Sequence, residues 1–198
     1  MISHIGRLFL TLLIVLFPAT LSAAPADTKG NLDSFDAFMA KAMEDFKVPG
    51  SAVAVVKDGK ILFAKSYGYR DTARKLPVTG KTLFPIASIT KSFTVTALGT
   101  LVDQGRLEWD KPVREYLPGF RMYDPVATEQ LTPRDLITHR SGLPRHDLMW
   151  YSSSFTREQL VARLRYLELS KPIRSTFQYN NLMFVTVAYL RGQVAGTS

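Results

Sequence analysis

Two residues that could do chemistry together stand three positions apart, namely Ser88 and Lys91 in the segment SITK. On a helix, side chains at this spacing share one face, so the Lys91 amine can reach the Ser88 hydroxyl. Ser88 would lie in the first turn, where unpaired backbone N–H groups and the helix dipole favour an anion. A neutral lysine could accept the serine proton, so the pair predicts a serine nucleophile. Because the spacing is common by chance, an ordinary helical serine beside a solvated lysine is the plainer alternative.

A tyrosine and an asparagine form a second candidate pair, Tyr179 and Asn181, at the start of an apolar stretch. A tyrosinate beside a lysine cation can serve as a general base, because the positive charge lowers the pKa of the phenol. The Asn181 amide offers both a donor and an acceptor to a substrate amide. A buried tyrosine followed by an asparagine helix cap is the alternative interpretation of these residues.

Histidine-based chemistry is a third possibility, although the chain contains only three histidines and no cysteine. The absence of cysteine excludes a thiolate nucleophile, a disulfide framework and a thiolate metal site. With so few histidines, we expect neither a metal nor any other cofactor. His139 or His146 could combine with Asp135 or Asp147 in a Ser-His-Asp arrangement. A histidine-dependent esterase is therefore an alternative, beside a purely structural role for these histidines in turns.

Helical patterns predict the elements that would carry both candidate pairs. A helix over residues 88–104, stopped by Gly105, would carry Ser88 and Lys91. A second helix over residues 181–194 would begin directly after Tyr179. Both pairs are thus expected at helix starts, where side chains can project into a cleft.

The rest of the chain shows further helix and strand signals. Apolar residues recur at helical spacing from Leu32 to Phe46, which predicts a helix. Asp58 and Gly59 then join two apolar runs, which predicts a β-hairpin because both residues tolerate positive φ. Thr132 and Thr156 are each expected to cap a short helix downstream.

The amino terminus resembles a secretory signal. Arg7 precedes an apolar run over residues 8–17 and a small-residue stretch over 21–26. The run is shorter than the roughly 20 residues that span a bilayer. We therefore predict a signal peptide at residues 1–23, a secreted or periplasmic protein, and no stable membrane anchor after cleavage. The net charge of +8 comes from interspersed charges, typical of a solvated surface, so no nucleic-acid partner is expected.

Taken together, these motifs resemble the family of serine β-lactamases and penicillin-binding proteins, in its class C β-lactamase-like branch of esterases, D-aminopeptidases and carboxypeptidases. The family's nucleophile helix, its LLTHTSGLP stretch and its Tyr-x-Asn motif have counterparts here in the same order. The resemblance runs from about Asn31 to Gly196. The matching segments are residues 48–60, 67–71, 84–93 (FPIASITKSF), 136–144 (LITHRSGLP) and 177–181 (FQYNN).

The resemblance implies an α/β fold, β-lactamase/transpeptidase-like, with an antiparallel sheet flanked by helices and an all-helical lobe. It implies Ser88 as the acyl-accepting nucleophile and Lys91 as its proton partner. Tyr179 would act as base and then as acid to the leaving group, and Asn181 would bind the substrate. The Ser88 N–H would supply half of the oxyanion hole. The expected partner is a small-molecule or peptide substrate: a β-lactam, a D-amino-acid peptide or an ester. Whether Lys91 or Tyr179 takes the first proton is left open, as is the oligomeric state.

The third motif of the family, Lys/His-Thr/Ser-Gly on an edge strand, has no counterpart after Asn181. We therefore expect residues 24–198 to be the N-terminal portion of the hydrolase domain, with the C-terminal sheet strands missing in this chain. Two smaller departures are Ala87, where the family often has glycine, and Asn180, where serine or alanine is common. The alternative to an active hydrolase is a catalytically incompetent fragment or a binding-only relic of the family.

Overall fold

A computed structural model describes residues 34–197, which form two compact units. The first ends at Phe84 and the second begins at Pro85. The predicted signal peptide at residues 1–23 lies outside the described residues. Among the described residues, no helix is long and apolar enough to cross a membrane.

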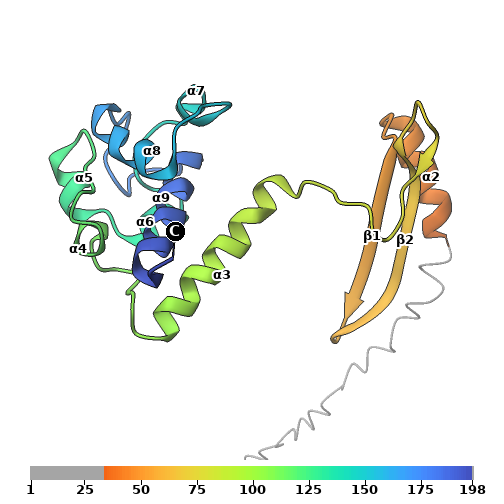
Figure 1. Ribbon diagram of the computed structural model, residues 1–198, viewed down its shortest axis with the longest axis horizontal. Coiled ribbons are helices and arrows are strands. Elements are labelled where there is room, and N and C mark those ends of the chain that lie inside the picture. Colours follow the sequence, from red (N-terminus) through yellow and green to blue (C-terminus); the bar gives the residue numbers. More distant parts are fainter. Residues whose placement is uncertain (1–33, 198) are drawn as a thin grey trace, which may run out of the picture. The chain divides into compact units, whose positions relative to one another are not determined.

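The first unit combines one helix with a three-stranded antiparallel sheet in the order β1-β2-β3 (Figure 1). The helix and the hairpin predicted from the sequence are both confirmed. Asp58 and Gly59 form the turn with φ values of 51° and 72°, the left-handed region that an Asp-Gly pair tolerates. The elements are α2 (Phe35–Asp45), β1 (Gly50–Lys57), β2 (Lys60–Asp71) and β3 (Leu76–Pro77).

Helix α2 is tied to strand β2 by one aromatic and two polar contacts. The Phe35 ring meets the Phe63 ring edge-on at 5.3 Å between centroids. The Asp36 carboxylate accepts hydrogen bonds from Lys65 Nζ at 2.5 Å and from the Tyr67 hydroxyl at 2.8 Å. Desolvation and the bond to Asp36 raise the pKa of Tyr67 to about 12. These contacts hold α2 on the sheet face that carries alternate residues of β2.

The second unit is helical in its described part, and α9 lies at its centre. Helix α9 packs against α3, α4, α6 and α8, and it contributes four fully buried apolar side chains, Leu182, Met183, Val187 and Leu190. The chain as a whole is therefore α/β, with an antiparallel sheet and a helical unit. The helices are η1 (Ala87–Ile89), α3 (Thr90–Asp103), α4 (Val113–Tyr116), α5 (Pro125–Gln130), α6 (Pro133–Ile137), α7 (Asp147–Trp150), α8 (Arg157–Arg163), η2 (Leu164–Tyr166) and α9 (Asn181–Ala195) (Figure 1).

Both predicted capping residues begin helices of this unit. Thr132 accepts from the Asp135 N–H while the Asp135 carboxylate accepts from the Thr132 N–H, which makes a reciprocal capping box at the start of α6. Thr156 and Gln159 form the same arrangement at the start of α8. Each box satisfies two backbone donors that the first helical turn would otherwise leave without partners.

Candidate active site

Three hydrogen bonds bring the four predicted site residues together. Ser88 Oγ lies 2.5 Å from the Tyr179 hydroxyl oxygen, and either oxygen can be the donor. Lys91 Nζ donates to Ser88 Oγ at 3.2 Å and to Asn181 Oδ1 at 2.7 Å. The two sequence motifs, about 90 residues apart, thus converge on one network within the second unit.

Ser88 differs from its predicted setting in one respect. It lies in the short 3-10 turn η1 that leads into α3, whereas the sequence predicted the first turn of one continuous α-helix. The preceding residue, Ala87, has a φ of 44°, and this left-handed conformation is one that glycine adopts without strain. The family's frequent glycine at that position therefore has a backbone reason. The turn leaves Ser88 exposed.

The Lys91 ammonium group sits among aromatic faces as well as hydrogen-bond acceptors. Its nitrogen lies 4.8 Å from the centre of the Tyr179 ring and 5.2 Å from that of Phe184. A cation at such distances from aromatic rings is attracted to their negative faces. Lys91 is therefore held from several sides, and its side chain is half-buried.

The pKa of the Tyr179 phenol is lowered by its surroundings. Hydrogen bonding to Lys91 is the largest cause, and the bond to Ser88 comes next. The charge of Lys91 adds to this effect, as does Arg145, whose guanidinium carbon lies 5.2 Å from the centre of the Tyr179 ring. A phenol with a lowered pKa beside a serine hydroxyl is suited to accept the serine proton.

The two neighbouring asparagines have different roles. Asn180 is fully buried, and its Oδ1 caps α9 by accepting the Met183 N–H at 3.1 Å. Its Nδ2 donates to the carbonyls of Leu143 and Pro144, at 3.0 and 2.7 Å. The helix-cap interpretation therefore applies to Asn180, while Asn181 directs its Oδ1 to Lys91.

Residues 139–142 pair through backbone hydrogen bonds with residues 170–178, which lie just before Tyr179. We call this pair of segments the clamp. Its backbone bonds include Gln178 N–H to the His139 carbonyl at 2.8 Å, Arg174 N–H to the Arg140 carbonyl at 2.8 Å and Ser170 N–H to the Gly142 carbonyl at 3.0 Å. Gly142 has a φ of 76°, and a Cβ there would lie 2.1 Å from the Lys171 carbonyl oxygen. Only glycine fits this approach, so the clamp explains the glycine of the LITHRSGLP segment.

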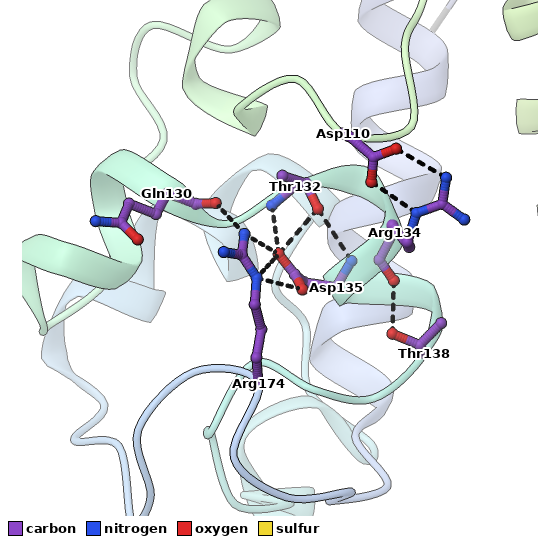
Figure 2. A network of polar contacts seen from close by, with 7 residues as sticks. All are labelled: Asp110, Gln130, Thr132, Arg134, Asp135, Thr138 and Arg174. Carbon is purple, nitrogen blue, oxygen red and sulfur yellow. Dashed lines mark hydrogen bonds and ion pairs between the residues drawn. The ribbon is translucent and has the colours of Figure 1, made fainter.

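An ion-pair network fastens the same loop to α6 (Figure 2). The buried Asp135 carboxylate accepts hydrogen bonds from Arg174 Nε and Nη2, the latter at 2.8 Å. The same carboxylate accepts from the N–H and the hydroxyl of Thr132. Arg174 Nη2 also donates to the Gln130 carbonyl at 2.8 Å. A second, exposed pair joins Arg134 to Asp110. The loop that ends at Tyr179 is therefore anchored at Arg174.

The histidines occupy positions that do not match a Ser-His-Asp triad. His139 Nδ1 accepts the Asn180 N–H at 3.1 Å, and Asp135 is bonded to Arg174 and Thr132 instead. Asp147 accepts from Arg145 Nε at 2.7 Å and from the Trp150 indole. No hydrogen bond joins either histidine to a carboxylate or to Ser88 within residues 34–197. The geometry therefore gives no support to the histidine-dependent alternative.

A pocket of about 500 Å³ opens beside the network. Its lining comes from η1 and α3, which carry Ser88 and Lys91, from Trp150 of α7, from Arg157 of α8 and from α9. No group of three or more potential metal-ligating side chains occurs in the described part of the chain. The lining includes Ser88, Lys91, Trp150, Arg157, Asn181 and Phe184.

Sequence reasoning did not find two side chains that touch Tyr179. Arg145 follows the LITHRSGLP segment and belongs to no motif, so its place over the Tyr179 ring is visible only in three dimensions. The sequence indicates His139 only as a candidate triad member, whereas in the structure its ring lies 4.6 Å from the Tyr179 ring and accepts the backbone N–H of Asn180. The position of His139 within LITHRSGLP was the only available signal.

Comparison with known proteins gives a consistent result. The family model described as Beta-lactamase matches residues 35–198. The chain is 34% identical over 166 residues, 78% of its length, to the protein named unguisins hydrolase ungD' of Aspergillus campestris. Among solved structures, it resembles the octameric penicillin-binding protein homologue from Pyrococcus abyssi with a TM-score of 0.74 and 30% identity over 85% of the chain. It resembles EstCE1, described as a hydrolase with promiscuous acyltransferase activity, with a TM-score of 0.74 and 26% identity over 84% of the chain.

The chain spans only part of each of these proteins. It covers 30% of the length of the Aspergillus protein. It covers 40% of the Pyrococcus chain and 47% of the EstCE1 chain.

Proposed function

This chain belongs to the beta-lactamase family, and we propose that it acts there as a serine hydrolase that forms an acyl-enzyme on Ser88. The relatives it matches bear the names of hydrolases and beta-lactamases, which supports the reaction class. The single observation that carries the proposal is the 2.5 Å contact between Ser88 Oγ and the Tyr179 hydroxyl, with Lys91 bonded to the same serine.

The proposed reaction begins with transfer of the Ser88 proton to the Tyr179 phenolate. The serine oxygen then bonds to the substrate carbonyl carbon, and the carbonyl oxygen becomes an oxyanion to which the Ser88 N–H is one donor. Collapse of this intermediate breaks the bond to the leaving group, which takes the proton from Tyr179. In deacylation, the Tyr179 phenolate takes a proton from water as the water oxygen bonds to the acyl carbon. Collapse of this second intermediate breaks the bond between the acyl carbon and Ser88 Oγ, which takes the proton back from Tyr179, and the acid is released. Lys91 stabilises the phenolate throughout by its charge.

The proposed substrates are amides, β-lactams or esters, taken as small molecules or peptides. The names of the relatives support this range, since they include an unguisins hydrolase and a class C beta lactamase. A site built on an activated serine suits any of these carbonyl compounds, because each has a carbonyl carbon open to attack and a leaving group.

The test is covalent labelling of the full chain with a fluorescent penicillin and, separately, with a fluorophosphonate. We expect the unaltered protein to be labelled, Ser88→Ala to be unlabelled, and Ser92→Ala to be labelled normally. Ser92 is the matched control because it lies on α3, is exposed, and its hydroxyl donates to the carbonyl of Ile89, the residue just before α3. Labelling of Ser88→Ala would contradict the proposal.

Two other outcomes would favour the alternatives. Folded protein that no reagent labels would favour a binding-only member of the family. Labelling that survives Lys91→Ala but not His139→Ala would favour a histidine-dependent esterase, because that mechanism does not use the lysine.

We also propose that the protein works outside the cytoplasm after removal of residues 1–23. The order of charge, apolar run and small residues in this segment supports the proposal. Mass spectrometry of the N-terminus, after expression with the native leader, should find a mature chain that begins close to Ala24. A chain that retains Met1 in the cytoplasmic fraction would contradict it.

A further inference from the structure

His139 holds the chain on both sides of Tyr179. Its backbone carbonyl accepts the Gln178 N–H at 2.8 Å, and its ring Nδ1 accepts the Asn180 N–H at 3.1 Å. The residues bonded to His139 are therefore the two direct neighbours of Tyr179. His139 has a φ of 59°, a left-handed conformation in which histidine is enriched among non-glycine residues.

The His139 side chain also packs against the tyrosine itself. It is only 8% exposed. Its ring lies 4.6 Å from the Tyr179 ring, 5.2 Å from Phe184 and 5.4 Å from Phe177, measured between centroids. Because the Tyr179 ring has His139 and Lys91 as close neighbours, a shift of the histidine would change the distance from the phenol to Ser88 and Lys91.

We propose that His139 is a positioning residue, whose neutral ring fixes the Tyr179–Asn180 backbone so that the phenol meets Ser88 and Lys91. This inference rests on the proposed function of Tyr179 as a base. It assigns to His139 a role distinct from proton transfer, because its bonds and ring contacts in the described chain run to the Tyr179 segment and to α9, and none runs to Ser88.

The neutral state of the ring is necessary for this role. Nδ1 can accept the Asn180 N–H only when it carries no proton, so the remaining ring proton belongs on Nε2. Burial, and then the nearby charge of Lys91, hold the pKa of His139 below its usual range. The charged group that faces the ring from α3 is Lys91, and Tyr179 is the titratable group that faces it from the loop. Both the burial and the lysine favour the form that accepts the bond.

The experiment compares His139→Leu with His139→Asn in the full chain. Leucine removes the acceptor, whereas the asparagine Oδ1 can accept the Asn180 N–H and asparagine tolerates the left-handed backbone. The first readout is the ionisation of Tyr179, which is monitored by absorbance at 295 nm as pH is raised. For each protein, the titration of the same protein with Tyr179→Phe is subtracted, so that only Tyr179 contributes. The second readout is the rate of acylation by the fluorescent penicillin.

We expect Tyr179 to ionise below the ordinary value of about 10 in the unaltered protein and in His139→Asn, and near that value in His139→Leu. Acylation should fall about 100-fold in His139→Leu, as a misplacement of about 1 Å does to a reacting group, and should largely recover in His139→Asn. If His139→Leu does not fold, His139→Gln replaces it in the experiment. We expect the same changes in Tyr179 ionisation and acylation rate, because the longer glutamine side chain places its amide oxygen beyond the position of Nδ1.

If Tyr179 ionises in His139→Leu at the same pH as in the unaltered protein, the inference is overturned, even if that variant is less stable. The titration also separates this inference from the proposed function. If the unaltered protein is not acylated, the function proposal fails, yet the shift in Tyr179 ionisation between the leucine and asparagine variants still tests His139.

Discussion

The Asp135 carboxylate and the Arg174 guanidinium, 39 residues apart in sequence, form an ion pair at 2.8 Å whose acidic partner is buried (Figure 2). The pair joins the start of α6 to the loop that ends at Tyr179. Because the same carboxylate caps α6 through Thr132, one acidic group supports both the helix and the loop.

The first prediction concerns acid stability. Burial opposes ionisation of Asp135, but the hydrogen bonds from Arg174 and Thr132 outweigh it and hold its pKa below the usual value. A carboxyl with a lowered folded-state pKa stabilises the protein above its unfolded pKa, near 4, and this stabilisation disappears as pH falls through the folded value. We expect Asp135→Asn to lose about 2 kcal/mol at pH 7 and to show less further loss below pH 4.

Thermal unfolding between pH 3 and 7 measures this effect. Asp110→Asn is the matched control, because Asp110 also pairs with an arginine but is exposed, and exposed ion pairs contribute little. Equal acid sensitivity of Asp135→Asn and the unaltered protein would show that Asp135 is not the responsible group.

The second prediction concerns the charge beside the phenol. Lys91→Met removes the largest cause of the lowered Tyr179 pKa. Because less of Tyr179 is then in the phenolate form that serves as the base, the acylation rate at neutral pH should fall, by at most the roughly 10² to 10⁴ that a general base contributes, and the remaining rate should rise at higher pH than in the unaltered protein. Arg145→Met should move the pH profile in the same direction but less, because Arg145 is a lesser cause of the shift. The measurement is the acylation rate from pH 5 to 10, and an unmoved profile in Lys91→Met would contradict the prediction.

The third prediction separates the two asparagines. Asn180→Ala removes the cap of α9 and leaves the buried Leu143 carbonyl without its Asn180 donor, so we expect a loss of about 2–3 kcal/mol in the free energy of unfolding. Asn181→Ala should unfold at nearly the temperature of the unaltered protein and lose acylation instead. Melting temperatures and acylation rates of both variants decide this. The reverse assignment of effects would be inconsistent with the hydrogen bonds described.

The fourth prediction concerns the clamp. Gly142→Ala places a Cβ against the Lys171 carbonyl in a left-handed conformation, and we expect a loss of about 2 kcal/mol or more. Gly119→Ala is the control, because a Cβ there meets nothing within 4 Å, and its effect should lie within about 0.5 kcal/mol. Urea unfolding of both variants measures the difference. Equal urea midpoints for Gly142→Ala and Gly119→Ala would contradict the prediction, because the clamp would then accommodate the added Cβ without loss of stability.

Local features of the fold could be predicted from the sequence because their causes are local. The Asp58–Gly59 turn needs two residues that tolerate positive φ, the cap at Thr132 needs a hydroxyl followed by a proline, and the box at Thr156 needs a hydroxyl and an acceptor three residues on. The Ser88–Lys91 contact belongs to the same class, since one helical turn sets the distance between these side chains.

The contacts around Tyr179 could not be predicted in this way. Ser88 and Tyr179 are 91 positions apart, and their contact depends on how α3 packs against α9. The resemblance to a family suggested that these residues meet. No pattern in the sequence indicated that Arg145 covers the tyrosine ring or that His139 accepts the Asn180 N–H. Such contacts follow from long-range packing, which spacing does not encode.

The clamp also determines which positions near this site can be substituted during evolution. Helices α7 and α8 and the 3-10 turn η2 lie between its two segments in the sequence, and within α7 no residue is buried and Leu148 is 94% exposed. Because the clamp holds both ends of this stretch, we expect that Leu148, the one exposed residue of α7, can vary without moving Ser88 or Tyr179. Substitution of Leu148 should therefore leave acylation of Ser88 unchanged, so this position can diversify while the nucleophile is preserved.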